Sequence, residues 1–239
     1  MQFTDIDYRD GAADLRGYLA CDENAATPRP GIVVFHEGVG LEEFAMGRAR
    51  RLAELGYVAL AADMFGERRQ ARNLQQVATL VGGLRSEPQR IRSRGRAALE
   101  TLGALPQVDT TRLAAIGFCF GGSVALELAR DGAELKAAVS FHGVLSTQMP
   151  ARPGSVKASV LVLTGADDPL APPDQVKAFE DEMRAATVRD WQVIVYGNTL
   201  HGFTNPAADG SMMRTALYNE QADRRSWAAM LALFDEVLS

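Results

Sequence analysis

One cysteine in this sequence stands between closely spaced glycines, where nucleophilic chemistry is possible. The stretch 117–122 reads G-F-C-F-G-G, which has the G-x-[Ser/Cys]-x-G spacing of a nucleophile elbow. A strand that turns into a helix within three residues strains the backbone of the central residue, Cys119, while glycines let the two elements pass closely. The helix N-terminus favours a thiolate. Cys119 is therefore the predicted nucleophile, the alternative being a buried structural cysteine at a strand end.

A nucleophile of this kind needs an acid and then a histidine further along the chain, and both are present in that order. Asp168 comes first and His201 second. The histidine would take the thiol proton, and the carboxylate would hold the imidazole in the correct tautomer. Among the three histidines, His142 also follows a predicted strand but precedes the acid, so His201 is favoured. Asp167 competes with Asp168, which is favoured by its place in the pattern G-x-x-D-P.

A carboxylate, Glu37, directly follows a buried strand predicted over 32–35. It could act on the thiol, or it could be a surface turn residue. The pattern H-E-x-x-G lacks the second histidine of a zinc site, so neither a metal nor another cofactor is expected. The backbone N–H groups of Phe120 and Gly38 are the predicted donors of an oxyanion hole.

The elements that must position these residues alternate along the chain. Predicted strands cover 2–8, 15–20, 32–35, 57–62, 113–116, 137–141, 160–164 and 191–196. Predicted helices cover 41–52, 91–105, 121–129, 175–186 and 227–238, and residues 64–86 indicate a loop and a weak helix. The first two strands form an antiparallel hairpin, and the rest predict a mostly parallel sheet with helices on both faces. In such a sheet, sites form at the carboxyl ends of the strands, where the four candidate catalytic side chains all fall.

Length and composition indicate an ordinary globular α/β protein. The 239 residues are 47% hydrophobic and 23% charged, which favours one domain over 1–239. The loop over 150–154 is too short for a separate lid domain. A net charge of −5 argues against nucleic acid as a partner, and no apolar run reaches the roughly 18 residues of a membrane helix.

Cysteine usage and the N-terminus favour a cytoplasmic setting. There are two cysteines, and Cys21 looks like core filler, so a stabilising disulfide is not expected. The first residues have neither the basic start nor the apolar core of a signal peptide. The expected partner is a small molecule, and the chain is expected to be a monomer or homodimer. The arginines at 85, 90, 92, 94 and 96 are predicted to form a solvated helix face.

Taken together, the motifs resemble those of the dienelactone hydrolase family over nearly the full chain. The matching stretches are H-E at 36–37, A-D-M-F-G at 62–66, G-F-C-F-G-G at 117–122, G-x-x-D at 165–168 and H-G-F at 201–203. The resemblance implies an α/β-hydrolase fold and a triad of Cys119, His201 and Asp168. It also implies that Glu37 helps to generate the thiolate. The family's reference reaction is hydrolysis of a dienelactone to maleylacetate.

The sequence departs from this family where the substrate would bind. Family members that cleave dienelactone bind its carboxylate with arginines, one of them shortly after the catalytic histidine. Here residues 202–206 contain no arginine, and the next is Arg214. Less charged esters or lactones are therefore the predicted substrates, unless an arginine at 68, 69, 72 or 85 replaces the contact.

Two other classes of protein are alternatives to the hydrolase. A non-catalytic or redox-sensing protein could keep the fold and a reactive thiol. Such a protein needs no oriented base, so the presence of both His201 and Asp168 argues against it. A peptidase-like or acyl-transfer relative is disfavoured because no lid or propeller domain is present to shape a peptide site.

Overall fold

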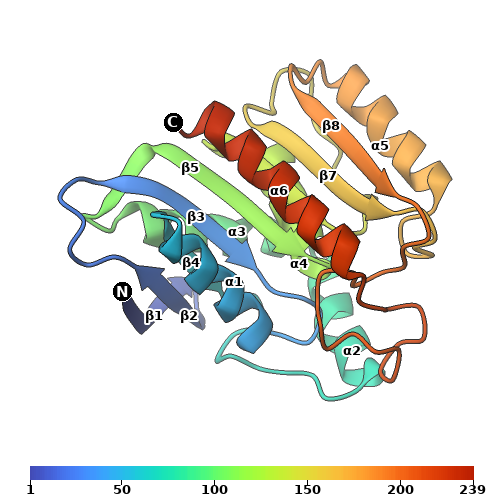
Figure 1. The fold of residues 1–239 in the computed structure, drawn as a ribbon, viewed down its shortest axis with the longest axis horizontal. Coiled ribbons are helices and arrows are strands. Elements are labelled where there is room, and N and C mark those ends of the chain that lie inside the picture. The colour runs from blue at the N-terminus through green and yellow to red at the C-terminus, as the bar shows by residue number, and fades with distance from the viewer.

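A computed structural model describes residues 1–239 and contains a single eight-stranded sheet (Figure 1). Its strand order is β1-β2-β4-β3-β5-β6-β7-β8, with β2 antiparallel to β1 and β4 and every later pair parallel. The strands are β1 Gln2–Asp10, β2 Ala13–Cys21, β3 Arg29–Phe35, β4 Val58–Ala62, β5 Val108–Phe118, β6 Ala137–Phe141, β7 Ser159–Gly165 and β8 Trp191–Tyr196. The helices are α1 Glu43–Glu54, α2 Leu74–Arg85, α3 Pro88–Gly103, α4 Phe120–Arg130, α5 Pro173–Ala185 and α6 Glu220–Val237.

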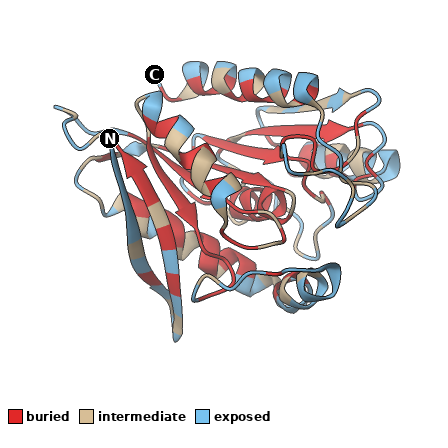
Figure 2. Ribbon diagram, turned by 60° about the horizontal axis from the view of Figure 1, so that its bottom comes forward, coloured by how far each residue is buried: buried red, intermediate tan, exposed pale blue.

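The sheet separates two hydrophobic cores. Successive strand residues point to opposite faces, so Ile32 and Val34 of β3 join one core, and Val33 and Phe35 join the other. Helices α1 and α6 close the first core, and α2 to α5 close the second. Figure 2 shows the buried strands in the middle and helices whose exposed residues face outward. Burial on both faces explains why the parallel strands read as continuous apolar runs.

The predicted fold class is confirmed: this is an α/β-hydrolase fold, with a mostly parallel sheet, helices on both faces and an antiparallel N-terminal hairpin. Residues 142–158, between β6 and β7, form a loop without helix or strand and hold no lid. None of the six helices has the length and apolar character that a membrane span requires.

One prediction about a helix face is wrong. Two of the five arginines expected in solvent, Arg92 and Arg94, are buried on α3. Their positions are explained by acidic neighbours on other elements, because Arg92 pairs with Glu127 of α4 at 2.8 Å and Arg94 lies 3.8 Å from Asp10 of β1. Burial of such charges is tolerated only when they are paired and hydrogen-bonded.

Candidate active site

The turn from β5 into α4 has the geometry that the glycine spacing predicted. Cys119 precedes the first residue of α4 with φ 54° and ψ −115°, a region that side chains rarely adopt. A Cβ on Gly117 would lie 1.9 Å from the carbonyl oxygen of Gly121, and one on Gly121 would lie 2.2 Å from that of Phe35. Glycine is therefore required at both positions for strand, helix and β3 to approach so closely.

The loops after β7 and β8 bring an aspartate and a histidine together. Nδ1 of His201 lies 2.8 Å from Oδ2 of Asp168, and both side chains are almost fully buried. Asp168 also accepts a hydrogen bond from the backbone of Leu170 at 2.8 Å. Asp167 is exposed, so of the two candidate acids only Asp168 contacts the histidine. If Nδ1–H donates to the carboxylate, the lone pair of the neutral imidazole is at Nε2.

The other ring nitrogen of His201 is directed to the reactive end of the site. Nε2 is buried and has no hydrogen-bond partner at ordinary geometry. Burial alone lowers the pKa of His201, but the negative charge of Cys119 and the hydrogen bond to Asp168 raise it to about 10. Among the effects that raise this pKa, the charge of Cys119 is the largest. His201 is thus protonated at neutral pH whenever Cys119 is a thiolate.

Glu37 extends from the end of β3 toward the same place. Its carboxylate accepts a hydrogen bond from Nδ2 of Asn205 at 2.6 Å. Burial raises its pKa, and the Asn205 hydrogen bond and the charges of His201 and Arg48 oppose that rise. The residue as a whole is half-buried, but its carboxylate is surrounded by protein. This burial of the carboxylate explains why its pKa is raised. Glu37 is therefore not the surface turn residue of the alternative reading.

Two backbone N–H groups are free beside the cysteine. Phe120 is the first residue of α4, so its N–H has no partner within the helix. The N–H of Gly38 donates to no protein group. Both residues line the same cavity as Cys119. Phe120 and Gly38 remain the predicted oxyanion donors.

The cavity has a volume of about 370 Å³ and an apolar majority in its lining. Its lining includes the three candidate catalytic residues Cys119, His201 and Glu37. Helix α2 contributes further lining residues, among them Val77 and Val81. Its charged lining residues are Glu37, Glu42, Asp209 and Arg85. Acidic groups therefore outnumber basic ones around the space that a substrate would occupy.

Of the four arginines considered as a substitute clamp, only Arg85 lines this cavity. Arg68 pairs with Asp5, Arg72 pairs with Glu42, and Arg69 donates to the carbonyl oxygen of Phe65. The guanidinium of Arg85 makes no ion pair, and the residue is exposed. A carboxylate-bearing substrate would meet at most this one arginine.

Sequence reasoning missed three neighbours of the site. Asn205 lies in the stretch 202–206, from which the sequence analysis drew only the lack of an arginine, and its Nδ2 donates a hydrogen bond to Glu37. His36 donates from Nδ1 to the carbonyl oxygen of Glu37 at 2.6 Å and accepts the N–H of Met64 at Nε2. His142 was considered only as a rival base, and it contacts the backbone of Cys119. His36 and His142 directly follow strands, and Asn205 lies in the loop after β8; polar residues at such places are too common to interpret alone.

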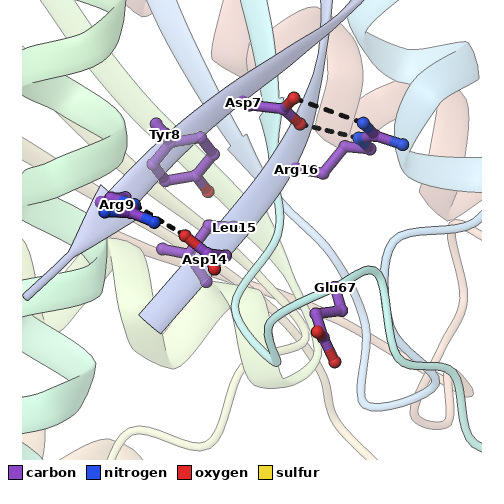
Figure 3. Close-up of a pocket in the computed structure, with 7 residues that line it drawn as sticks. All are labelled: Asp7, Tyr8, Arg9, Asp14, Leu15, Arg16 and Glu67. Atoms are coloured by element: carbon purple, nitrogen blue, oxygen red, sulfur yellow. Dashed lines mark hydrogen bonds and ion pairs between the residues drawn. The ribbon is translucent and has the colours of Figure 1, made fainter. Parts of the chain in front are cut away.

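A larger hollow of about 580 Å³ lies elsewhere, against the β1–β2 hairpin (Figure 3). Four of its five charged side chains are paired at the surface, Arg9 with Asp14 and Arg16 with Asp7, and the fifth is Glu67. It contains no nucleophile. No group of three histidine, cysteine or carboxylate side chains in the protein is placed to hold a metal ion.

Comparisons with known proteins show the family of this chain. The model of the dienelactone hydrolase family matches residues 15–238. A curated Yersinia pestis protein named "Putative carboxymethylenebutenolidase" is 28% identical over 93% of this chain and 84% of its own length. The solved structure called m3DLH is 47% identical, covers 100% of this chain and 99% of its own, and has a TM-score of 0.95. The dienelactone hydrolase-like promiscuous phosphotriesterase P91, from metagenomic libraries, is 45% identical with the same coverage and TM-score. The chain is a hydrolase of the class that acts on esters and lactones, and it belongs to the dienelactone hydrolase family.

Proposed function

We propose that this protein is a cysteine-dependent hydrolase of small, weakly charged esters or lactones. The observation that carries the proposal is the meeting, in one cavity, of a strained Cys119 and the buried, unpartnered Nε2 of His201. Strain and an unsatisfied buried nitrogen both cost stability, and such costs cluster at functional sites. We propose further that residues 1–239 form one α/β-hydrolase domain. Its two unpaired cysteines fit a reducing cytoplasm.

In the first half of the reaction, the thiol proton passes to Nε2 of His201, and the thiolate attacks the carbonyl carbon of the substrate. The carbonyl oxygen becomes an oxyanion and accepts the N–H groups of Phe120 and Gly38. The intermediate then collapses. The C–O bond of the leaving group breaks, Nε2–H protonates the departing alcohol oxygen, and the acyl group remains on Cys119 as a thioester.

In the second half, a water molecule attacks the thioester. Neutral Nε2 of His201 takes the proton of the water and returns it to the sulfur as the C–S bond breaks, which releases a carboxylic acid. Asp168 keeps Nδ1 protonated throughout and stabilises the imidazolium. For a lactone, the alcohol and the acid are two ends of one product.

Glu37 gives the thiol a second place to lose its proton. A carboxylate whose pKa is raised by burial is a better base than an exposed one. We propose that Glu37 takes part in thiolate formation, and that Asn205 orients it through the 2.6 Å hydrogen bond.

The experiment is turnover of a panel of small esters and lactones by the wild type, Cys119→Ala and the matched control Cys21→Ala. Cysteine-dependent hydrolysis predicts activity that is lost in Cys119→Ala and kept in Cys21→Ala. Mass spectrometry after brief iodoacetamide treatment should find Cys119 modified before the buried Cys21. Equal activity of the wild type and Cys119→Ala would refute the proposal. Reversible oxidation of Cys119 without turnover of any ester would instead favour the redox-sensing alternative.

Phosphotriesters are a second candidate substrate class. P91, which is 45% identical over the whole chain, is described as a promiscuous phosphotriesterase. The cavity here, with three acidic residues and one arginine, suits an uncharged substrate better than an anionic one. Release of p-nitrophenol from paraoxon by the wild type but not by Cys119→Ala would support this class, and its absence would exclude paraoxon as a substrate.

A further inference from the structure

His142 contacts the backbone of the residue that the chemistry depends on. It directly follows β6, is completely buried and has a φ of 41°, so it too is strained. The N–H of Cys119 lies 3.1 Å from Nδ1 of His142 and 3.0 Å from the carbonyl oxygen of Phe141. This N–H is thus shared between the sheet and an imidazole. Two neighbouring strained residues are tied together by one hydrogen bond.

The opposite edge of the His142 ring is fixed by a chain of contacts. Nε2 lies 2.8 Å from Oγ1 of Thr204. The carbonyl oxygen of Thr204 accepts a hydrogen bond from Nη2 of Arg48 at 2.6 Å. Arg48 in turn pairs with Asp223 at 2.7 Å and lies over the ring of Trp227. The imidazole is therefore held from both sides, and it has no freedom to leave the backbone of Cys119.

The surroundings determine which ring nitrogen carries the proton. Burial lowers the pKa of His142 well below its usual range, and the charges of His201 and Arg48 lower it further. A neutral ring that accepts the Cys119 N–H at Nδ1 must carry its proton on Nε2, where it donates to Thr204. The ring of His142 also packs edge-on against that of His201, with centroids 5.1 Å apart. His142 therefore touches both the nucleophile's backbone and the base.

We propose that His142 is a positioning residue, which holds Cys119 in its strained conformation by accepting its N–H at Nδ1. This inference rests on the proposed function, because it concerns the same nucleophile. A residue at positive φ stays there only when its surroundings over-determine it. A reacting group that shifts by about 1 Å can slow a reaction about a hundredfold. His142 would thus act on the rate of the chemical step and leave substrate binding unchanged.

The test compares two substitutions at His142 that differ in one property. His142→Leu introduces an apolar side chain of similar size that has no acceptor. His142→Asn places Oδ1 close to the position of Nδ1 and keeps the acceptor for Cys119. With p-nitrophenyl acetate as the probe, His142→Leu should lower kcat by about tenfold to a hundredfold with KM unchanged. His142→Asn should recover most of that loss. Equal kcat values for the two variants, or a wild-type kcat in folded His142→Leu, would overturn the proposal.

A second pair of variants covers the case in which His142→Leu does not fold. Thr204→Val removes the hydroxyl that fixes Nε2, and Thr204→Ser keeps it. Thr204→Val should lower kcat in the same direction as His142→Leu, while Thr204→Ser should match the wild type. Equal kcat in these two variants would contradict a role for the anchored imidazole. Thr164→Val is the control, since the Thr164 hydroxyl is also buried but has no hydrogen-bond partner.

Failure of the proposed function would be recognised separately. If the wild type shows no turnover that depends on Cys119, that function is wrong, and the rate of Cys119 alkylation by iodoacetamide replaces kcat in the same comparisons. Alkylation slowed in His142→Leu and restored in His142→Asn would still support the positioning role. Identical alkylation rates in the two variants would refute it.

Discussion

Two hollows of this protein contain charged side chains, but they differ in how those charges are satisfied. The larger one, about 580 Å³, lies against the hairpin, where the Arg9–Asp14 pair is 72% and 63% exposed (Figure 3). The smaller one, about 370 Å³, lies at the carboxyl ends of the strands and includes Glu37, Cys119 and His201. Water satisfies the charges of the first, whereas in the second the carboxylate of Glu37 and Nε2 of His201 are buried by protein.

Volume and charge by themselves therefore do not identify a reactive site. An exposed ion pair is already solvated, so it has little to offer a substrate. A buried imidazole nitrogen without a partner, or a carboxylate whose pKa is raised by burial, gains from an incoming group. The hairpin hollow has neither feature, and the strand-end cavity has both.

The largest expected effect on kcat is that of replacing Asp168, and its neighbour Asp167 serves as the control. Asp168→Asn should lower kcat by about a thousandfold to ten-thousandfold, because an amide cannot hold the imidazole tautomer or stabilise its charge. The exposed neighbour gives the control, since Asp167→Asn should leave kcat within the error of the wild type. Steady-state kinetics of both on one ester measures the effect. A comparable loss in Asp167→Asn would mean that the hydrogen bond to His201 is not the relevant contact.

Glu37→Gln should slow the chemical step by about 10²- to 10⁴-fold while the fold persists, because an amide cannot accept the thiol proton. The variant should be as stable as the wild type at neutral pH or more stable. A carboxyl group whose pKa is raised in the folded state destabilises it once ionised, and Gln avoids that cost. Stopped-flow kinetics and urea unfolding at pH 7 measure the two effects. Unchanged kcat would make Glu37 a structural residue.

The contrast between local and distant contacts explains what the sequence could predict. The elbow was readable because steric crowding of Gly117 and Gly121 imposes glycine at fixed spacing. The order of acid and base followed from strand ends that meet at one edge of the sheet. By contrast, the pairing of Glu37 with Asn205 joins residues 168 positions apart. No local pattern encodes such a contact.

The buried arginines failed to be predicted for the same physical reason. An arginine-rich helix resembles a solvated face unless the partner charges are known, and Glu127, the partner of Arg92, lies on another helix. His142 had been weighed as a base, since a histidine at a strand end has several possible uses. Only its contact with the Cys119 backbone distinguishes positioning from proton transfer.

The charge of the substrate should have an effect of intermediate size on kcat/KM. Dienelactone, which bears a carboxylate, should be hydrolysed with a lower kcat/KM than a neutral ester of similar size, by about tenfold to a hundredfold, because charge-assisted contacts of about 1.5–3 kcal/mol are missing. Arg85→Gln should raise KM for dienelactone and leave KM for the neutral ester unchanged. A clear preference for dienelactone that disappears in Arg85→Gln would show that this single arginine suffices as a clamp.

The charge on His201 should appear in the pH dependence of stability. Its pKa is raised from 6.5 to about 10 in the folded protein. A raised pKa contributes stability that is complete below pH 6.5 and is lost as the pH rises through about 10. Cys119→Ala removes the charge that raises this pKa most, so the pKa of His201 should be lower in the variant. The variant should therefore lose this contribution to stability at a lower pH than the wild type does. Urea unfolding from pH 6 to 10 compares the two proteins, and parallel curves would contradict the coupling of His201 to Cys119.

The smallest expected effect is that of a substitution at the β1–β2 hairpin. It tests the prediction that the exposed charges of the hairpin hollow have no part in catalysis. Arg9→Gln breaks the 2.7 Å ion pair with Asp14, whose two side chains remain largely in water. Water replaces the lost partner, so the free energy of unfolding should change by less than about 1 kcal/mol, and salt of about 0.5 M should remove even that difference. kcat/KM should not change. Unfolding of both proteins at low and high salt, with ester hydrolysis in parallel, measures each quantity. A marked loss of activity would mean that the hollow against the hairpin takes part in the reaction. Solvent-exposed ion pairs would then not distinguish an inactive hollow from an active one in this protein.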